Sequence, residues 1–241
     1  NIPNIVITSS IGCPFKCTYC VTPRMWKYQK RSIRNIITGL EKILQKKPVE
    51  DVVFFDDAFL IHHQKEELLK ELSKFDVRYH LPNGIHARLV DKKIAKLFAK
   101  ANFKVIKLGY ETSDEEMQIK TGGKVTNEDL VKAANYLLNE GLNETSAYIM
   151  ANLPGQKVED VLRGIDFCFD LGIIPSVNEF TPIPNTPQYM DLVSRGWLEI
   201  DTDPLLLNNS FLPYWWEYGM SVDEIEKIKA YLRDKKAERG N

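Results

Sequence analysis

The sequence predicts an α/β fold in which six parallel strands alternate with helices. Short runs of β-branched and aromatic residues alternate along the chain with segments whose apolar residues recur at helical spacing. This alternation favours right-handed β-α units and a parallel sheet. No low-complexity linker divides the sequence. Periodicity leaves two closures open, namely an open doubly wound sheet and an incomplete β/α barrel.

The first half of the chain supplies four of the expected strands. Val52–Phe55 is continuously apolar, as is typical of a strand covered on both faces. Pro48 should stop the helix before it. The other expected strands are Ile5–Thr8, Val77–Leu81 and Val105–Gly109, and the expected helices are Ile33–Leu44, Leu68–Phe75 and Ile94–Phe98.

The second half continues the same pattern. Thr126 and Asp129 form a variant capping box before a helix that runs to Leu138, and Gly141 suits its C-terminal end. Residues 181–219 are rich in proline and aromatic residues, so we expect an irregular segment across one end of the sheet. The remaining expected elements are a strand at Ala147–Met150, a helix at Val158–Phe169 that ends at Gly172, a strand at Ile173–Phe180 and a last helix at Val222–Leu232.

Composition and net charge exclude several classes of protein. The 241 residues are 44% hydrophobic and 27% charged with a net charge of −1, which excludes a disordered, collagen-like or coiled-coil chain. Near-neutral charge argues against a general nucleic-acid binder, and no apolar run reaches the roughly 20 residues of a membrane span. We expect a single domain over 1–241, with a core at about 3–190 and an extension at about 191–241. The first residue is Asn1 rather than Met, as expected for a domain taken from a longer protein.

Three of the four cysteines, Cys13, Cys17 and Cys20, follow the first expected strand directly. Parallel β/α folds place their chemistry at that end of the strand. Three crowded thiols indicate a metal site in a reducing, cytoplasmic compartment, whereas Cys168 lies on an apolar helix face and is expected in the core. An iron–sulfur cluster on three thiolates keeps one iron open. The alternatives are a three-cysteine zinc site, thiols that only pack, or a ferredoxin-type carrier, which needs a fourth nearby cysteine.

The segment C-x-x-x-C-x-x-C, with Tyr19 before its last cysteine, resembles the signature of the radical SAM superfamily. The resemblance covers nearly the whole chain and implies a partial (β/α)6 barrel of the TIM type. It implies that Cys13, Cys17 and Cys20 hold a [4Fe–4S] cluster and that S-adenosylmethionine (SAM) chelates the fourth iron. It also implies that Tyr19 lies near the adenine. The implied activity is oxygen-sensitive reductive cleavage of SAM to a 5′-deoxyadenosyl radical, which then abstracts hydrogen or supports methyl transfer.

Two further segments resemble SAM-binding elements of the family. Asp56 and Asp57 end the second expected strand, where the family contacts the SAM amino group, although its usual Gly-Gly-Glu motif is absent here. Gly109, Glu111 and Ser113 resemble a Gly-x-Glu-Ser element, in which a carboxylate accepts from ribose hydroxyls or the methionine ammonium. In the alternative reading, an aspartate or Ser113 caps a helix and Glu111 is a solvated charge.

Arg88 and the pair Pro154-Gly155 complete the expected cofactor-binding residues. Arg88 follows the third expected strand and would pair with the SAM carboxylate or hold Glu111; the alternative is a surface ion pair. Pro154 and Gly155 resemble the family's Gly-Leu-Pro-Gly-Glu segment, with a tight turn that approaches the adenosyl group; turn geometry alone is the alternative.

The motifs together look most like the radical SAM domain of proteins with a cobalamin-binding domain, which methylate unreactive carbons. Cobalamin would then bind through a domain absent from this chain. A methylthiotransferase is an alternative, but its second cluster needs three further cysteines, and Cys168 alone lies outside the loop. A non-catalytic iron–sulfur or zinc binding module is the other alternative. The resemblance implies an unknown substrate and a one-electron donor such as a flavodoxin or ferredoxin.

Overall fold

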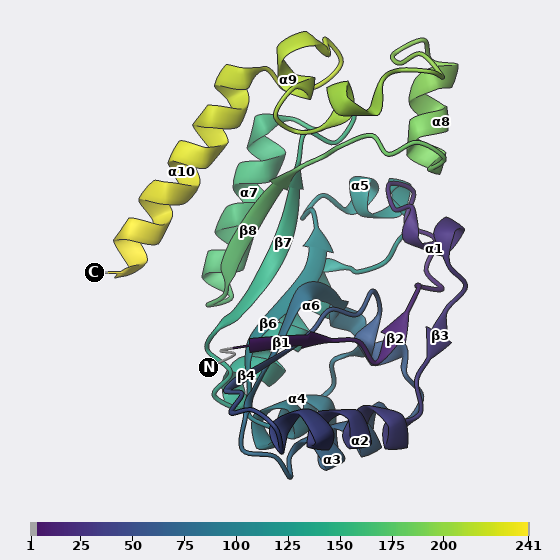
Figure 1. The fold of residues 1–241 in the computed structure, drawn as a ribbon. Coiled ribbons are helices and arrows are strands. Elements are labelled where there is room, and N and C mark those ends of the chain that lie inside the picture. Colours follow the sequence, from purple (N-terminus) through teal and green to yellow (C-terminus); the bar gives the residue numbers. More distant parts are fainter. Residues whose placement is uncertain (1–3, 241) are drawn as a thin grey trace.

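The computed structural model describes residues 4–240, so the expected domain start at residue 3 and the chain ends at 1 and 241 lie outside the described residues. Its main feature is a six-stranded sheet in which every neighbouring pair is parallel (Figure 1). The strands, in sheet order, are β1 (Asn4–Ile7), β4 (Asp51–Phe54), β5 (Arg78–His86), β6 (Phe103–Glu111), β7 (Thr145–Ala151) and β8 (Ile174–Glu179).

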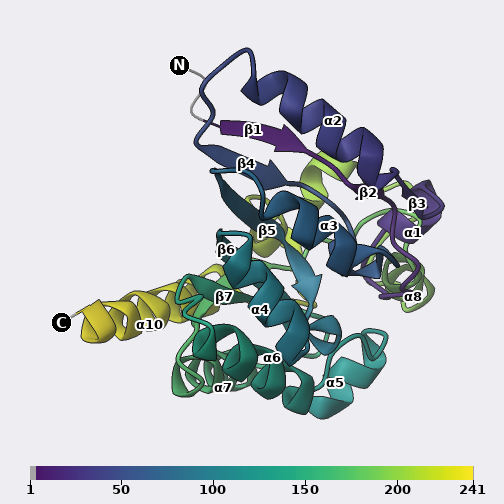
Figure 2. The same ribbon diagram turned by 90° about the horizontal axis from the view of Figure 1, so that it is seen from below.

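The strand order decides between the two closures. Neighbours in the sheet follow chain order without a reversal, whereas a doubly wound sheet contains a point where the order reverses. Right-handed crossovers that all advance in one direction place their helices on one face. Figure 2 shows this layer outside the curved sheet, and the fold is a partial (β/α)6 barrel. The layer consists of α2 (Ile33–Leu44), α3 (Lys65–Leu72), α4 (Lys92–Lys100), α6 (Asn127–Asn139) and α7 (Val158–Asp170).

The core lies between this sheet and its helices. Aromatic rings fill the first half of it: Phe98 and Phe103 meet edge to face with ring centroids 4.8 Å apart, and Phe54 and Phe59 pack beside them. The capping box predicted at Thr126 and Asp129 is present at the start of α6. The structure confirms the expected helices and strands, and their ends differ from the expected ones by a few residues.

Two strands run further than predicted. β5 was expected to stop at Leu81 but continues to His86, because register shifts against β6 accommodate the Pro82-Asn83-Gly84 segment, which otherwise reads as a turn. β6 similarly continues past Gly109 to Glu111. These extensions carry His86 and Glu111 to the carboxyl edge of the sheet.

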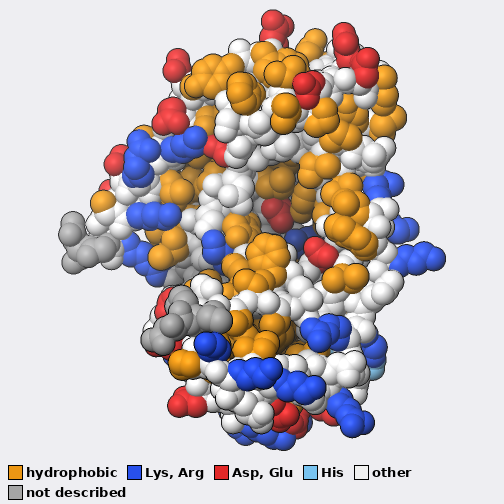
Figure 3. Space-filling model, in the orientation of Figure 1, with side chains coloured by type: hydrophobic (Ala, Val, Ile, Leu, Met, Phe, Trp, Pro, Cys, Tyr) orange, Lys and Arg blue, Asp and Glu red, His pale blue; other side chains and the backbone are white. Residues whose placement is uncertain are grey.

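The segment 181–219, expected to be irregular, instead contains short helices. Thr186 caps α8 (Pro187–Ser194) by accepting from the Tyr189 N–H, and Pro187 occupies the first turn. Two further pieces, η3 (Pro204–Leu207) and α9 (Leu212–Trp215), precede α10 (Val222–Gly240), which packs against α7. A second apolar cluster joins these segments to the barrel, and hydrophobic side chains are exposed over them (Figure 3).

Other short elements surround the cysteine loop. They are the ribbon β2 (Ser10–Ile11) with β3 (Gln29–Lys30), η1 (Phe59–Ile61), η2 (Ala87–Leu89), α1 (Thr22–Met25) and α5 (Glu115–Lys120). Within residues 4–240, no helix combines the length and apolarity that crossing a membrane requires.

Candidate functional site

Two aspartates anchor the loop that carries the cysteines. The buried Asp56 carboxylate accepts from the backbone N–H and hydroxyl groups of both Ser9 and Ser10, at 2.6–3.1 Å. Asp57 accepts from the Gly12 N–H at 2.8 Å. Burial raises the pKa of Asp56, against these hydrogen bonds, which lower it. The structure thus gives both aspartates a role in holding the loop, which the sequence reasoning did not foresee.

The loop is held from its other side by the turn after α5. The Thr18 N–H donates to the Thr121 carbonyl at 3.1 Å. Gly122 has a φ of +114°, and a Cβ there would lie only 3.1 Å from the Cα of Cys17. The close approach of these two backbones therefore fixes the position of Cys17.

The three thiols share one cavity of about 580 Å³. Burial raises the pKa of Cys13 and of Cys17. Within the described residues, no group of three Cys, His, Asp or Glu side chains is arranged to hold a single metal ion. A thiol donor set around a cavity of this size fits an iron–sulfur cluster in which three irons are each held by one thiolate. Cys168 is fully buried in α7, as predicted.

Glu111 lies beside the cysteine loop in an unusual backbone conformation, with a φ of +77°. Its Oε1 accepts from Nζ of Lys124 at 3.3 Å, an ion pair that no sequence motif indicated. Burial alone would lower the pKa of Lys124. The charges of Glu111 and Cys17 raise it by more than burial lowers it, so the pKa lies above its usual value and the ammonium is charged. Burial and then the Glu111 carboxylate raise the pKa of Tyr19 well above its usual value. The structure thus brings Tyr19, Glu111 and Cys17 together.

Gly109 explains how Lys124 reaches this position. A Cβ on Gly109 would meet Nζ of Lys124, so the absence of a side chain at Gly109 lets the ammonium lie directly over the strand. The turn at Gly122 and Gly123 returns the chain from α5 to the strand edge.

Arg88 and Ser113 have other partners. The Arg88 guanidinium donates to the Gly123 carbonyl, and its Nε lies 3.8 Å from Asp129 Oδ2. Lys124 therefore makes the ion pair with Glu111 that was expected of Arg88. The Ser113 hydroxyl lies 3.5 Å from where a Cβ on Gly164 of α7 would stand, which directs it at the outer helix layer.

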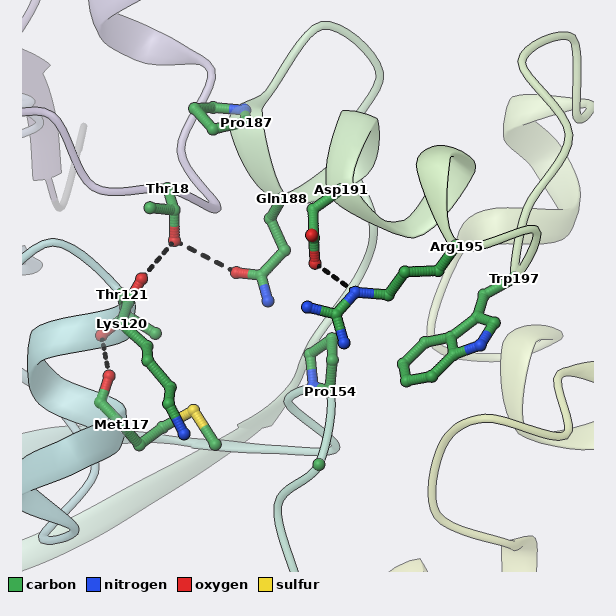
Figure 4. A pocket seen from close by; sticks show the side chains of 11 residues that line it. Thr18, Met117, Lys120, Thr121, Pro154, Pro187, Gln188, Asp191, Arg195 and Trp197 are labelled. Atoms are coloured by element: carbon green, nitrogen blue, oxygen red, sulfur yellow. Dashed lines mark hydrogen bonds and ion pairs between the residues drawn. The ribbon is translucent and has the colours of Figure 1, made fainter.

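Pro154 and Gly155 lie on a turn whose ends are joined by Gln156, which accepts from the Leu153 N–H and donates to the Met150 carbonyl. A second cavity of about 370 Å³ lies between this turn, α5, α8 and the cysteine loop (Figure 4). Thr18 of the loop donates to Gln188 across it at 3.2 Å. The turn and the cysteine loop therefore share a cavity wall.

His86 is a site residue that the sequence reasoning missed. It is 3% exposed, and its Nε2 lies 3.9 Å from Sγ of Cys13. Burial, followed by the charges of Lys124 and Arg88, lowers the pKa of His86 to about 3, so the ring is neutral near pH 7. The sequence did not indicate His86, because it lies at the end of the extension of β5, which was not predicted.

Comparisons with known proteins agree with this geometry. The family model of the Radical SAM superfamily matches residues 7–184. An uncharacterised methyltransferase of Pyrococcus horikoshii is 20% identical over 239 residues, which cover 97% of this chain and 49% of that protein. The ribosomal protein uS12 methylthiotransferase RimO of Clostridioides difficile is 27% identical over 204 residues, covering 75% of this chain and 44% of that protein. The chain thus spans about half the length of these relatives.

Solved structures share the fold. The radical S-adenosylmethionine methyltransferase TsrM from Kitasatospora setae, with tryptophan substrate and a SAM analogue bound, superposes with a TM-score of 0.72 at 19% identity. The match covers 80% of this chain and 39% of that one. Coproporphyrinogen III oxidase from Escherichia coli gives a TM-score of 0.64 at 15% identity, covering 97% of this chain and 53% of that one. Since the family model spans most of the sequence, the chain belongs to the radical SAM superfamily.

Proposed function

We propose that this chain binds a [4Fe–4S] cluster through Cys13, Cys17 and Cys20 and cleaves SAM reductively. The observation that carries the proposal is the arrangement of three thiols around one cavity. When bound, the cluster supplies one electron to the sulfonium of SAM, and its open iron supplies the chelation site.

The chain's own residues orient the cofactor and limit access of water. Glu111 presents a carboxylate, held by Lys124, that suits the ribose hydroxyls or the ammonium of SAM. Tyr19 lies beside it, partly buried against the second apolar cluster, where a ring edge can exclude water from the adenosyl group. The turn at Pro154 and Gly155 lines the neighbouring cavity.

We propose methyl transfer as the use of this chemistry. The support is the methyltransferase named among the relatives and the methyltransferase TsrM among the structural neighbours. Cobalamin would enter through a domain outside this sequence; the structural neighbour TsrM holds cobalamin together with a [4Fe–4S] cluster. Hydrogen abstraction without methyl transfer is the alternative outcome, distinguished by whether a labelled SAM methyl group reaches the product.

A flavodoxin or ferredoxin is proposed as the electron donor. Lys16, Arg24 and Lys27 line the cavity of the three thiols and are exposed, and no acidic residue lines that cavity. Such a basic rim suits an acidic partner. Reversing the charge of Lys16 and Lys27 should therefore slow SAM cleavage driven by flavodoxin but not cleavage driven by dithionite.

The test of the proposal is anaerobic reconstitution with iron and sulfide, followed by an assay for 5′-deoxyadenosine with SAM and dithionite. The reconstituted protein should form this product. Cys17→Ala should abolish it, and Cys168→Ala, the matched control in the core, should retain it. No product from a reduced, intact cluster would contradict the proposal.

A further inference from the structure

His86 contacts a cysteine ligand of the proposed cluster, although no motif assigns it a role. It ends β5, where its backbone pairs with Gly109 of β6. The imidazole is 3% exposed. Its Nε2 faces Sγ of Cys13 at 3.9 Å, within the range of an N–H···S hydrogen bond, and its Nδ1 has no partner among the described residues.

The ring is held in this orientation from two sides. The sheet register fixes the backbone of His86. The Phe15 ring from the cysteine loop lies against the imidazole, with centroids 3.9 Å apart and planes at 35°. A side chain packed between a strand and an aromatic ring presents one fixed edge to the sulfur.

The hydrogen-bond inventory assigns the proton of the neutral ring. A proton on Nδ1 would leave a buried donor without an acceptor, and with Cys13 as a thiolate ligand the Nε2 lone pair would face the lone pairs of the sulfur. A proton on Nε2 points at the sulfur, and a thiolate is a good acceptor. A doubly protonated ring would also donate from Nε2, so this contact does not depend on the ring's titration.

We propose that His86 is a positioning residue that donates from Nε2–H to Sγ of Cys13 and thereby raises the reduction potential of the cluster. This inference rests on the proposed function, because it requires the cluster. Hydrogen bonds to cluster sulfurs help to set the cluster potential. The reduced state carries one more negative charge, so the N–H dipole stabilises it more than the oxidised state. One electron enters from an external donor, and His86 neither gains nor loses a proton.

The first experiment measures the potential directly. Reconstituted wild type, His86→Leu and His86→Gln are titrated potentiometrically and followed by EPR of the reduced cluster. His86→Leu removes the donor, and the reduced-to-oxidised ratio at a fixed potential should fall about tenfold, which is about 59 mV for one electron. His86→Gln places an amide N–H near the Nε2 position and should recover most of the shift. His80→Leu, at the far end of the same strand, should leave the potential unchanged.

The second experiment uses the reconstituted wild type with its oxidised cluster, in which Cys13 is a thiolate ligand, and therefore needs no variant to fold. Nitrogen-15 NMR of the His86 imidazole should show a proton on Nε2. A ring protonated on Nδ1 alone would overturn the inference, as would an unchanged potential in His86→Leu with an intact cluster. A wild type that binds no cluster would contradict the proposed function, and the inference with it.

Discussion

Nζ of Lys124 lies 3.3 Å from Oε1 of Glu111, and the two side chains are only 15% and 13% exposed. The pair stands beside Cys17, on a strand edge where Gly109 leaves room for the ammonium. A largely buried ion pair next to the proposed cluster links the stability of the loop to the cofactor site. We therefore expect it to contribute to both folding and cofactor binding.

Removing one partner of this pair should cost more than removing both. Lys124→Met leaves the Glu111 carboxylate largely buried without its cation, and we expect a loss of about 2–3 kcal/mol, below the value for a fully buried pair. The double variant Lys124→Met/Glu111→Gln should cost less than the sum of the two single variants. Urea unfolding of all four proteins measures this coupling, and additive losses would show that the pair contributes nothing.

Glu111→Gln should weaken SAM binding about tenfold or more, because a charge-assisted hydrogen bond to the cofactor is lost. Equilibrium binding of SAM to the reconstituted protein measures the change. Glu144→Gln, an exposed substitution before the start of β7, is the matched control and should bind SAM normally. Equal affinity of Glu111→Gln and wild type would exclude this carboxylate from the SAM site.

Asp56→Asn should loosen the cysteine loop. Four donors of Ser9 and Ser10 converge on Oδ1, and the Ser9 N–H also reaches Oδ2. An amide is a weaker acceptor than a carboxylate, and its NH2 group would face the Ser9 N–H, donor against donor. We expect a loss of about 2–4 kcal/mol in unfolding free energy and fewer irons per chain after reconstitution. Iron content at the wild-type level in a destabilised variant would separate loop anchoring from cluster binding.

The lowered pKa of Asp51 predicts how the stability of the protein responds to acid. Hydrogen bonds from Arg78, and then from His80, hold the pKa of Asp51 well below its usual value of 3.8. A carboxyl with a depressed native pKa contributes stability above its unfolded pKa, and this stability is lost as the pH falls below about 4. The Asp51 side chain is 24% exposed and its partner Arg78 46% exposed, so solvent screening keeps the effect small. Melting temperatures from pH 2 to 6 should decline slightly less steeply for Asp51→Asn, and parallel curves would contradict this.

The sequence predicted the elements with strong periodicity and the residues that belong to a compact motif. Cys13, Cys17 and Cys20 sit in one loop with a specific spacing, and Glu111 lies two residues after an expected strand, so both could be singled out from local sequence. Strand order, which decided the barrel closure, depends on contacts between distant segments.

The positions of Lys124 and His86 in the site could not be predicted from the sequence, and the two reasons are related. Lys124 reaches Glu111 because Gly122 and Gly123 turn the chain back, and its ammonium lies over Gly109, which has no side chain. His86 reaches Cys13 only because a β-bulge extends β5 beyond a proline that reads as its end. Asp56 was expected to contact SAM, and the structure adds that its carboxylate accepts from the hydroxyls of Ser9 and Ser10 in the loop.

The most direct test of the central claim is the EPR spectrum of the reduced, reconstituted protein with and without SAM. Three thiolate ligands leave one iron open, so SAM should coordinate it and change the g-values of the reduced cluster. Identical spectra in the presence of saturating SAM would show that the cofactor does not bind the cluster, and would contradict the account.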